Sequence, residues 1–523
     1  MANGVATETG DAVREGLTSV TRGTLFLLVA TLCLVGLNFV SRVIVVRSIS
    51  ASDWSAFSFG LTLAAVLATF ATLGLPNAVA RSIPYATSDD ERRTMVRGTL
   101  WIGSVAALVA SLLLWVFATD IGRALGSPAI GVGLQYFPVA VATFTVANLI
   151  ASVFQGFEDV TPNALFIQII NPALFVAFLA AAIVLPPFGI DYSEALLTYA
   201  LANVVTLVLL VVYTWRRLPR WLPSGPTAPE ALGRLLRFAA PLFIVGVMAS
   251  ISGSGDTLIL GIYHESAVGT YTASLTLSRL LPIGIGAAAY IFLPVASKFV
   301  RQGDRDSIQV TYATVTKWMV LFSLPLFLLF EFLPSESLGF VYGAGYSTVV
   351  VPLQISVVGA FALTLLGPAT TAQVAYGQTR LLAYNAIVAG AADLGLSLVL
   401  IPPFGYAGAA VAWSSANVLF GVLSLAQVAS LSGVHPFRRH FVVPLLATAL
   451  PVGGALALLR PTLSYPALVG LGLGIAVLFV VLILATRSID EGDRLLLEAV
   501  ERLLGRPLPF VRRLGRFALR DVR

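Results

Sequence analysis

Residues 24–46 read TLFLLVATLCLVGLNFVSRVIVV and contain a single charged side chain, Arg42. A helix needs about 20 mainly apolar residues to cross the roughly 30 Å hydrocarbon core of a bilayer, so this stretch predicts a transmembrane helix. It is too long for the apolar region of a signal peptide, and no small-residue cleavage site follows it. We therefore expect this helix to remain in the mature protein.

The composition of the whole chain resembles that of this stretch. Of 523 residues, 57% are hydrophobic and 11% are charged, whereas an average soluble domain has about 25% charged residues. Cys33 is the only cysteine, which excludes an intrachain disulfide and a multi-cysteine metal site, and three histidines make a histidine-built metal centre improbable. We expect a membrane protein that holds no metal and binds no nucleic acid, despite a net charge of +6.

The same length rule, applied along the chain, predicts an all-α polytopic membrane protein with about 14 transmembrane helices. The predicted spans are 24–46, 57–80, 98–118, 131–153, 164–186, 194–215, 239–262, 273–297, 311–333, 349–373, 381–401, 407–431, 441–459 and 465–486.

The basic residues predict how these spans are oriented, since Lys and Arg gather in cytoplasmic loops. With a cytoplasmic N-terminus, 26 of the 32 basic residues fall on the cytoplasmic side. Three lie in outer loops (Arg47, Arg123 and Arg460) and three within spans (Arg42, Arg279 and Lys317). We expect both termini in the cytoplasm of a multi-pass protein of the cell membrane.

An internal repeat relates the two halves of the chain. Similar segments recur at a nearly constant offset of 214 to 221 residues. The pairs are Asp53-Trp54-Ser55-Ala56-Phe57 with Ala267-Val268-Gly269-Thr270-Tyr271, Gln155-Gly156 with Tyr376-Gly377, Pro186-Pro187-Phe188-Gly189 with Pro402-Pro403-Phe404-Gly405, and Ala202-Asn203-Val204 with Ala416-Asn417-Val418. Because each half has an even number of spans, the halves share one orientation, which is the parallel-repeat design of transporters.

This repeat predicts the domain organisation. We expect two six-helix lobes in a parallel pseudo-two-fold repeat, at 24–215 and 239–431, joined by a cytoplasmic linker at 216–238. The remaining parts are a cytoplasmic N-terminal segment (1–23), two further helices (441–486) and a basic amphipathic cytoplasmic tail (487–523). The apolar face and flanking arginines of such a tail favour a position in the membrane interface.

Three groups of residues resemble a known family. They are Gly74-Leu75-Pro76 with Arg81, then Asp256-Thr-Leu-Ile-Leu-Gly261 with Val268-Gly269-Thr-Tyr271-Thr-Ala-Ser274, and then Val374-Ala-Tyr-Gly377-Gln-Thr-Arg380 with Asn385, Ile401-Pro402 and Gly405-Tyr-Ala-Gly408-Ala-Ala410. In combination they are similar to the polysaccharide flippases (Wzx-like) of the multidrug/oligosaccharidyl-lipid/polysaccharide (MOP) exporter superfamily. The likeness covers roughly residues 24–431.

The resemblance implies a V-shaped transporter that alternates access. It also implies movement of a lipid-linked oligosaccharide to the outer leaflet for polysaccharide or glycoprotein assembly. The carrier lipid is then undecaprenyl diphosphate or dolichyl phosphate, and glycosyltransferases of the same pathway are candidate partners. Membrane lipids are a further partner. We expect no cofactor, and Na⁺ or H⁺ is the candidate coupling ion.

Two other functions fit the sequence less well than a flippase does. A cation-coupled drug exporter would favour a dense acidic cluster in the first lobe, which the sequence lacks. A membrane-embedded glycosyltransferase or polymerase would need paired carboxylates or metal ligands on a large outer loop, whereas the outer acidic residues are scattered singly. We therefore do not expect an enzyme, and we expect no catalytic residue.

Charged residues inside spans are the candidate site. Each costs about 2.5–3.5 kcal/mol to insert, so each needs a partner or a wet cavity. Arg42 and Asp256 are 214 residues apart and Arg279 is predicted in the same outer half. Our hypothesis is that Arg42 and Arg279 bind the carrier phosphate, which suits the fork of a guanidinium, and that Asp256 is their counter-ion or gate partner.

Structural explanations exist for the same residues. Arg42 could extend to the outer headgroups, and Asp256–Arg279 could be a structural pair. Arg81 is placed to attract the phosphate at the cytoplasmic entrance or to anchor its helix. Asp393, and also Asp256, are candidates for coupling to an ion, although a buried carboxyl can simply remain protonated. Lys317 is expected to extend its ammonium group to the cytoplasmic surface.

Overall fold

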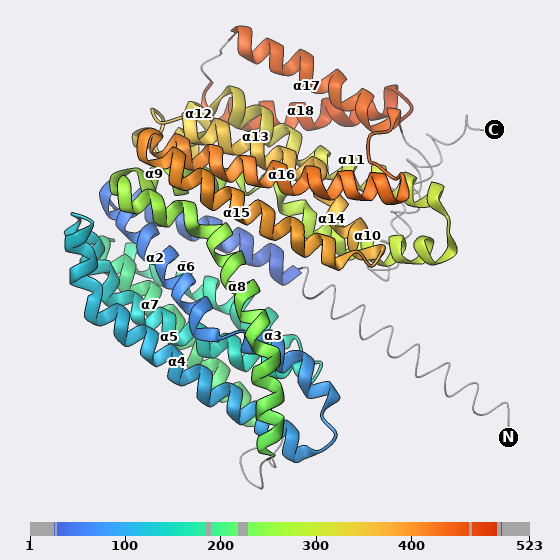
Figure 1. Ribbon diagram of the computed structural model, residues 1–523. Helices are drawn as coiled ribbons and strands as arrows, with labels where there is room; N and C mark the ends of the chain where they lie inside the picture. Colours follow the sequence, from blue (N-terminus) through green and yellow to red (C-terminus); the bar gives the residue numbers. More distant parts are fainter. Residues whose placement is uncertain are drawn as a thin grey trace, which may run out of the picture. The chain divides into compact units, whose positions relative to one another are not determined.

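The computed structural model describes residues 26, 29–184, 190–217, 228–459, 463–488 and 493. All regular secondary structure in these ranges is helical, as Figure 1 shows. Thirteen helices within them are long and apolar enough to cross a membrane. The predicted class, an all-α polytopic membrane protein, is therefore confirmed.

Contacts divide the chain into two compact units. The first unit contains residues 29–272 and 394–409, and the second contains the described residues of 273–393 and 410–493. These units follow packing, whereas the predicted lobes follow the sequence repeat. The lobe boundaries at 24–215 and 239–431 stay a prediction.

The first unit is built mainly from the helices of the first half of the chain. They are Val29–Ser48, α2 (Ala51–Thr72), α3 (Leu75–Ser82), η1 (Ile83–Tyr85), α4 (Asp89–Ala124), α5 (Pro128–Gly156), η2 (Asn163–Ile170), α6 (Asn171–Val184), α7 (Tyr192–Arg217), α8 (Pro229–Tyr263) and η3 (Glu265–Ala267). The start of α9 (Val268–Ser278) completes it, with the adjoining ends of α15 (Thr379–Phe404) and α16 (Tyr406–Ser432).

The second unit contains the rest of α9, α15 and α16 and the other helices of the second half. These are η4 (Leu281–Ile283), α10 (Gly284–Gln302), α11 (Arg305–Phe332), α12 (Pro334–Tyr342), η5 (Ala344–Tyr346), α13 (Val351–Leu366), α14 (Pro368–Ala375), α17 (Arg439–Leu459) and α18 (Tyr465–Ala485). Helix α11 packs against α10, α13, α17 and α18, so it is the centre of this unit.

Short polar caps define several helix ends beside the membrane. Ser88 accepts the Glu91 N–H at the start of α4, and Ser127 accepts the Ile130 N–H at the start of α5. Asp304 does the same for Ser307 at the start of α11. Each cap satisfies a backbone donor that the helix itself leaves without a partner.

The core of the first unit combines side chains of α3, α4, α5 and α8, and α8 packs directly against α3 and α4. Leu75 and Val79 of α3 are fully buried with Leu149 of α5 and Leu235 of α8. Gly74 has φ +71, and a Cβ there would lie 2.4 Å from the carbonyl oxygen of Ala239. Only glycine adopts this conformation without strain and allows α3 to approach α8 so closely.

The predicted spans correspond closely to the helices. Thirteen of the fourteen coincide with the apolar helices just described, although the second ends at Thr72 and continues as α3 after a left-handed turn at Leu73 and Gly74. The eighth span, 273–297, is interrupted: α9 ends at Ser278, and η4 separates it from α10. A proline at the second position of η4, Pro282, explains the break, because it cannot donate to the preceding turn.

Some predicted features lie outside the described residues. These are the N-terminal segment 1–23, the repeat turn 186–189, most of the linker 216–238 and most of the tail 487–523.

The prediction for Lys317 was wrong. Its side chain does not extend to the cytoplasmic surface: the residue is 1% exposed, and its ammonium lies 2.7 Å from a carboxylate oxygen of Asp493. The sequence placed Lys317 near the end of a span without revealing that the chain after α18 returns to α11.

Candidate transport site

A buried carboxylate lies near the end of α8. Asp256 is 1% exposed, and its Oδ1 accepts a hydrogen bond from the backbone N–H of Thr257 at 2.6 Å. Its Oδ2 accepts from the hydroxyl of Tyr271 on α9, a side chain that is itself fully buried. The carboxyl group is therefore held between α8 and α9 inside the first unit.

The hydroxyl of Tyr271 has two acceptors within reach. Besides Asp256, the carbonyl oxygen of Ala409 lies 3.4 Å away. A phenol has one hydrogen to donate, so it can satisfy only one of them at a time. If Asp256 carries a proton, Asp256 can donate to Tyr271 while Tyr271 donates to Ala409. Asp256, Tyr271 and the Ala409 carbonyl can thus accommodate one additional proton as a third hydrogen-bond donor.

The start of α2 is bonded to the segment that enters α9. The indole N–H of Trp54 donates to the carbonyl oxygen of Gly269 at 2.9 Å. The backbone N–H of Gly269 donates to the hydroxyl oxygen of Ser55 at 2.9 Å, and that hydroxyl donates to the carbonyl of Ser266 at 3.1 Å. These residues and the pair Ser58 and Thr272 are called the outer contact below, because the arginine distribution predicts this end of α2 to lie outside.

Two bonds of the outer contact join residues that correspond in the internal repeat. Gly269 and Ser55 are 214 positions apart, and so are Thr272 and Ser58, whose hydroxyls lie 3.1 Å apart. A residue can touch its own repeat counterpart only near the axis that relates the repeats. The parallel repeat predicted from the sequence would therefore place its pseudo-two-fold axis at the outer contact.

Glycine is required where α8 and α9 meet α2. A Cβ at Gly269 would lie 2.6 Å from the Ser55 hydroxyl and 2.9 Å from the Trp54 ring, and a Cβ at Gly261 would lie 2.3 Å from the Phe59 ring. Both glycines belong to the pattern that resembles the polysaccharide flippases. Their role in this structure is to let the two helices approach α2.

Three of the predicted site residues lie in the first unit. Arg42 is partly buried on the first helix and lies within electrostatic range of the Tyr199 hydroxyl of α7. Arg81 on α3 is exposed and lies over the ring of Phe238, with its guanidinium carbon 4.8 Å from the ring centre. Asp256 is the third, and Tyr271 is its hydrogen-bond partner.

The other two predicted site residues belong to the second unit. Arg279 is exposed and lies in the turn that separates α9 from η4. Asp393 is 2% exposed in the middle of α15. The proposed pairing of Arg42, Arg279 and Asp256 around a phosphate stays a prediction, as does a role of Asp393 in ion coupling.

Sequence reasoning missed a buried amide network in the second unit. Gln427 of α16 accepts from Gln373 of α14 at 2.7 Å, and it exchanges two hydrogen bonds of 2.8 Å with Asn385 of α15. Such a network holds three helices in one register, since leaving one amide without a partner in an apolar interior is costly. Uncharged side chains scattered over three spans give no periodic signal in sequence.

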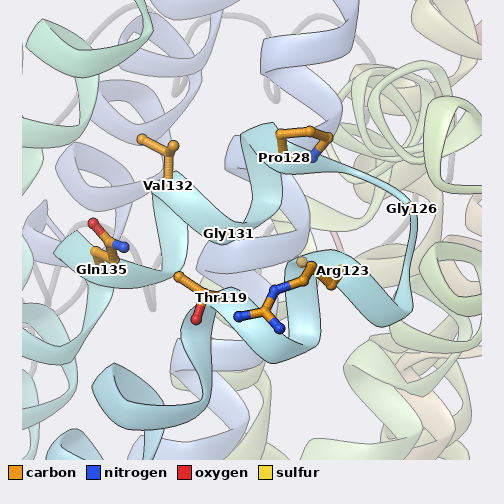
Figure 2. Close-up of a pocket in the computed structure, with 8 residues that line it drawn as sticks. Thr119, Arg123, Gly126, Pro128, Gly131, Val132 and Gln135 are labelled. Carbon is orange, nitrogen blue, oxygen red and sulfur yellow. The ribbon is translucent and has the colours of Figure 1, made fainter.

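A cavity of about 420 Å³ lies where α4 meets α5, and Figure 2 shows its lining. Glycines 122, 126 and 131 form much of the wall, with Thr119, Arg123 and Gln135 at its edge. Arg123 is paired with Asp120 at 3.3 Å, and both side chains are exposed. None of the site residues predicted from sequence lines this cavity.

Comparison with known proteins agrees with this architecture. The probable low-salt glycan biosynthesis flippase Agl15 of Haloferax volcanii is 24% identical over 460 residues, which is 87% of this chain and 93% of that protein. Among solved structures, the lipid II flippase MurJ in an inward closed conformation superposes with a TM-score of 0.67 and 14% identity, over 87% of this chain and 98% of MurJ. An inward-facing multidrug transporter of the MOP superfamily gives 0.61 and 14%, over 78% and 98%.

The fold is thus that of MOP-superfamily transporters, and the predicted relation to their polysaccharide flippase branch is confirmed. The family model described as polysaccharide biosynthesis protein matches residues 20–300, more than half of the chain. The chain therefore belongs to the polysaccharide biosynthesis protein family.

Proposed function

We propose that this flippase of glycan biosynthesis moves a lipid-linked oligosaccharide from the cytoplasmic to the outer leaflet by alternating access. The carrier is a polyprenyl or dolichyl phosphate or diphosphate. The family match and the Agl15 relative support the substrate class. The proposal includes cytoplasmic N- and C-termini and glycosyltransferases of the same pathway as partners.

The outer contact is the observation that carries alternating access. It joins segments that correspond in the repeat through short hydrogen bonds on the predicted pseudo-two-fold axis. Two repeats that rock about such an axis must break these bonds to open the outer side. Hydroxyl and backbone groups suit this task, because water replaces their hydrogen bonds at small net cost.

The charged residues are assigned roles within this proposal. Arg279, exposed at the break in the eighth span, and Arg42 bind the carrier phosphate, and Arg81 attracts it at the cytoplasmic entrance. A broken helix places a polar turn at membrane depth, which transporters use only where a cavity is present.

Coupling to an ion is assigned to Asp256 and Asp393. The hydroxyl of Tyr271 lies within reach of both Asp256 and the Ala409 carbonyl, so a protonated Asp256 can donate to Tyr271 while Tyr271 donates to Ala409. Na⁺ is the alternative coupling ion, since carboxylate and carbonyl oxygens are also hard ligands.

Depletion of the protein in its own host tests the transport direction. We expect lipid-linked glycan to accumulate facing the cytoplasm, measured by its inaccessibility to a glycosidase added outside intact cells. Accumulation on the outer face would instead indicate a glycosyltransferase or polymerase. Loss of resistance to cationic drugs with unchanged glycan would indicate an exporter.

Cross-linking the outer contact tests alternating access. In a Cys33→Ser background, Ser58→Cys with Thr272→Cys places two thiols where hydroxyls now lie 3.1 Å apart. We expect oxidation to stop flipping and a reductant to restore it, measured with a fluorescent lipid-linked glycan in vesicles. Each single cysteine variant is the control. Full transport by the cross-linked protein would contradict a gate at this position.

A further inference from the structure

Helix α11 carries two adjacent side chains that bind one carboxylate. The ammonium of Lys317 lies 2.7 Å from Oδ2 of Asp493, and the indole N–H of Trp318 donates to Oδ1 of the same residue at 2.6 Å. Lys317 also donates to the backbone carbonyl of Ser488 at 2.7 Å. Both oxygens of the carboxylate and the turn before it are therefore held by α11.

The chain reaches this position by a tight turn after α18. The N–H of Ser488 donates back to the carbonyl of Ile483 at 2.9 Å, and Arg487 has φ +49. Ser488 is 1% exposed, and its hydroxyl lies 2.7 Å from that of Thr486. The turn thus ends α18 and places the Ser488 carbonyl against Lys317 of α11, which packs against α18 in the same unit.

Burial makes this contact different from the surface ion pairs of the protein. The side chains of Lys317 and Asp493 are 2% and 3% exposed, whereas those of the surface pair Arg123 and Asp120 are 77% and 58% exposed. Removing one member of a buried pair leaves an uncompensated charge, which is strongly unfavourable. Removing both to water is far cheaper, since each group regains its hydration.

We propose that Lys317 and Asp493 form a reversible clasp that docks the start of the C-terminal tail on α11. The clasp is closed in this structure, and it opens when the turn that carries Ser488 and Asp493 lifts off α11, so that water reaches both Lys317 and Asp493. The chain beyond it carries eight further arginines. Because the attraction within a buried ion pair is largely offset by the desolvation of its charges, the pair holds the turn with a small net free energy, which allows release. This inference is independent of the transported substrate.

Thiol labelling tests the clasp on purified full-length protein in detergent. In a Cys33→Ser background, Ser488→Cys is the only thiol and reports whether the turn is covered. We expect slow reaction with a bulky maleimide in the parent, and labelling faster by about tenfold or more in Asp493→Asn and in Lys317→Met. Trp318→Phe removes only the indole donor, and it should accelerate labelling by a smaller factor, about threefold.

A double-mutant cycle and a charge control complete the test. If the pair itself holds the tail, combining Lys317→Met with Asp493→Asn accelerates labelling no more than either change alone. Asp304→Asn removes an exposed carboxylate at the start of the same helix and keeps a good N-cap, so it should label at the parent rate. Parent-like rates in both single variants and in Trp318→Phe, or additive effects in the double variant, would overturn the clasp.

Discussion

Tyr271 connects more of the candidate site than any residue singled out from sequence. Its hydroxyl reaches the buried carboxylate of Asp256 and the carbonyl of Ala409, and it lies two positions after Gly269 of the outer contact. A change in the protonation of Asp256 would therefore alter the hydrogen bonds of Tyr271, two residues from the place where α9 contacts α2. The proposed ion-coupling group and the proposed outer gate are thus separated along α9 by less than one helical turn.

Arg279 gives a direct test of phosphate binding at the residue scale. We expect Arg279→Ala to lower flipping by about ten- to a hundredfold, since a hydrogen bond to a charged group contributes about 1.5–3 kcal/mol. Arg279→Lys should retain part of the activity, because the charge remains but the planar fork of donors is lost.

The matched control for this substitution is Arg123→Ala. Arg123 is also an exposed arginine, and it lies on α4, away from the broken span. We expect it to leave transport unchanged in the vesicle assay. Wild-type flipping by both Arg279 variants would exclude a phosphate-binding role of this side chain.

The limits of sequence reasoning are clear from particular residues. Asp256 was identified because a charge inside an apolar span is conspicuous, and it is indeed buried. Tyr271 belongs to the repeat and to the flippase-like pattern, but its bond to Asp256 was missed, because a tyrosine in a span has no such signal. The repeat offset of 214 aligns Ser55 with Gly269, but an alignment does not predict that two aligned residues form a hydrogen bond with each other.

At the scale of elements, hydropathy predicted the positions of the helices but not the residues at which they begin and end. The apolar run 273–297 is continuous in hydropathy, yet Pro282 and the turn at Arg279 divide it into α9, η4 and α10. Hydropathy averaged over a window of residues does not reveal that Pro282 lacks a backbone N–H to donate. Helices α4 and α8 likewise extend beyond their predicted spans: Ser88 caps the start of α4, and the start of α8 is buried in the core that it shares with α3 and α4.

At the scale of the whole molecule, the arginine distribution makes a prediction about sidedness. In a Cys33→Ser background, Gly345→Cys introduces a thiol in η5, between α12 and α13, where a side chain meets nothing within 4 Å. His435→Cys introduces one at an exposed position between α16 and α17. We expect an impermeant maleimide to label Cys at 345 from outside intact cells and Cys at 435 only in inverted vesicles. The opposite pattern would reverse the orientation of every helix.

The bond between Ser58 and Thr272 has a consequence for how such a chain arises. If a half-length protein with one copy of the repeat forms a two-fold dimer, a residue on its axis meets the same residue of the other copy, which is an isologous contact. Fusing the two copies end to end leaves that self-contact in place and frees its two sides to differ. A serine facing a threonine is what one former surface looks like once its two copies are encoded separately.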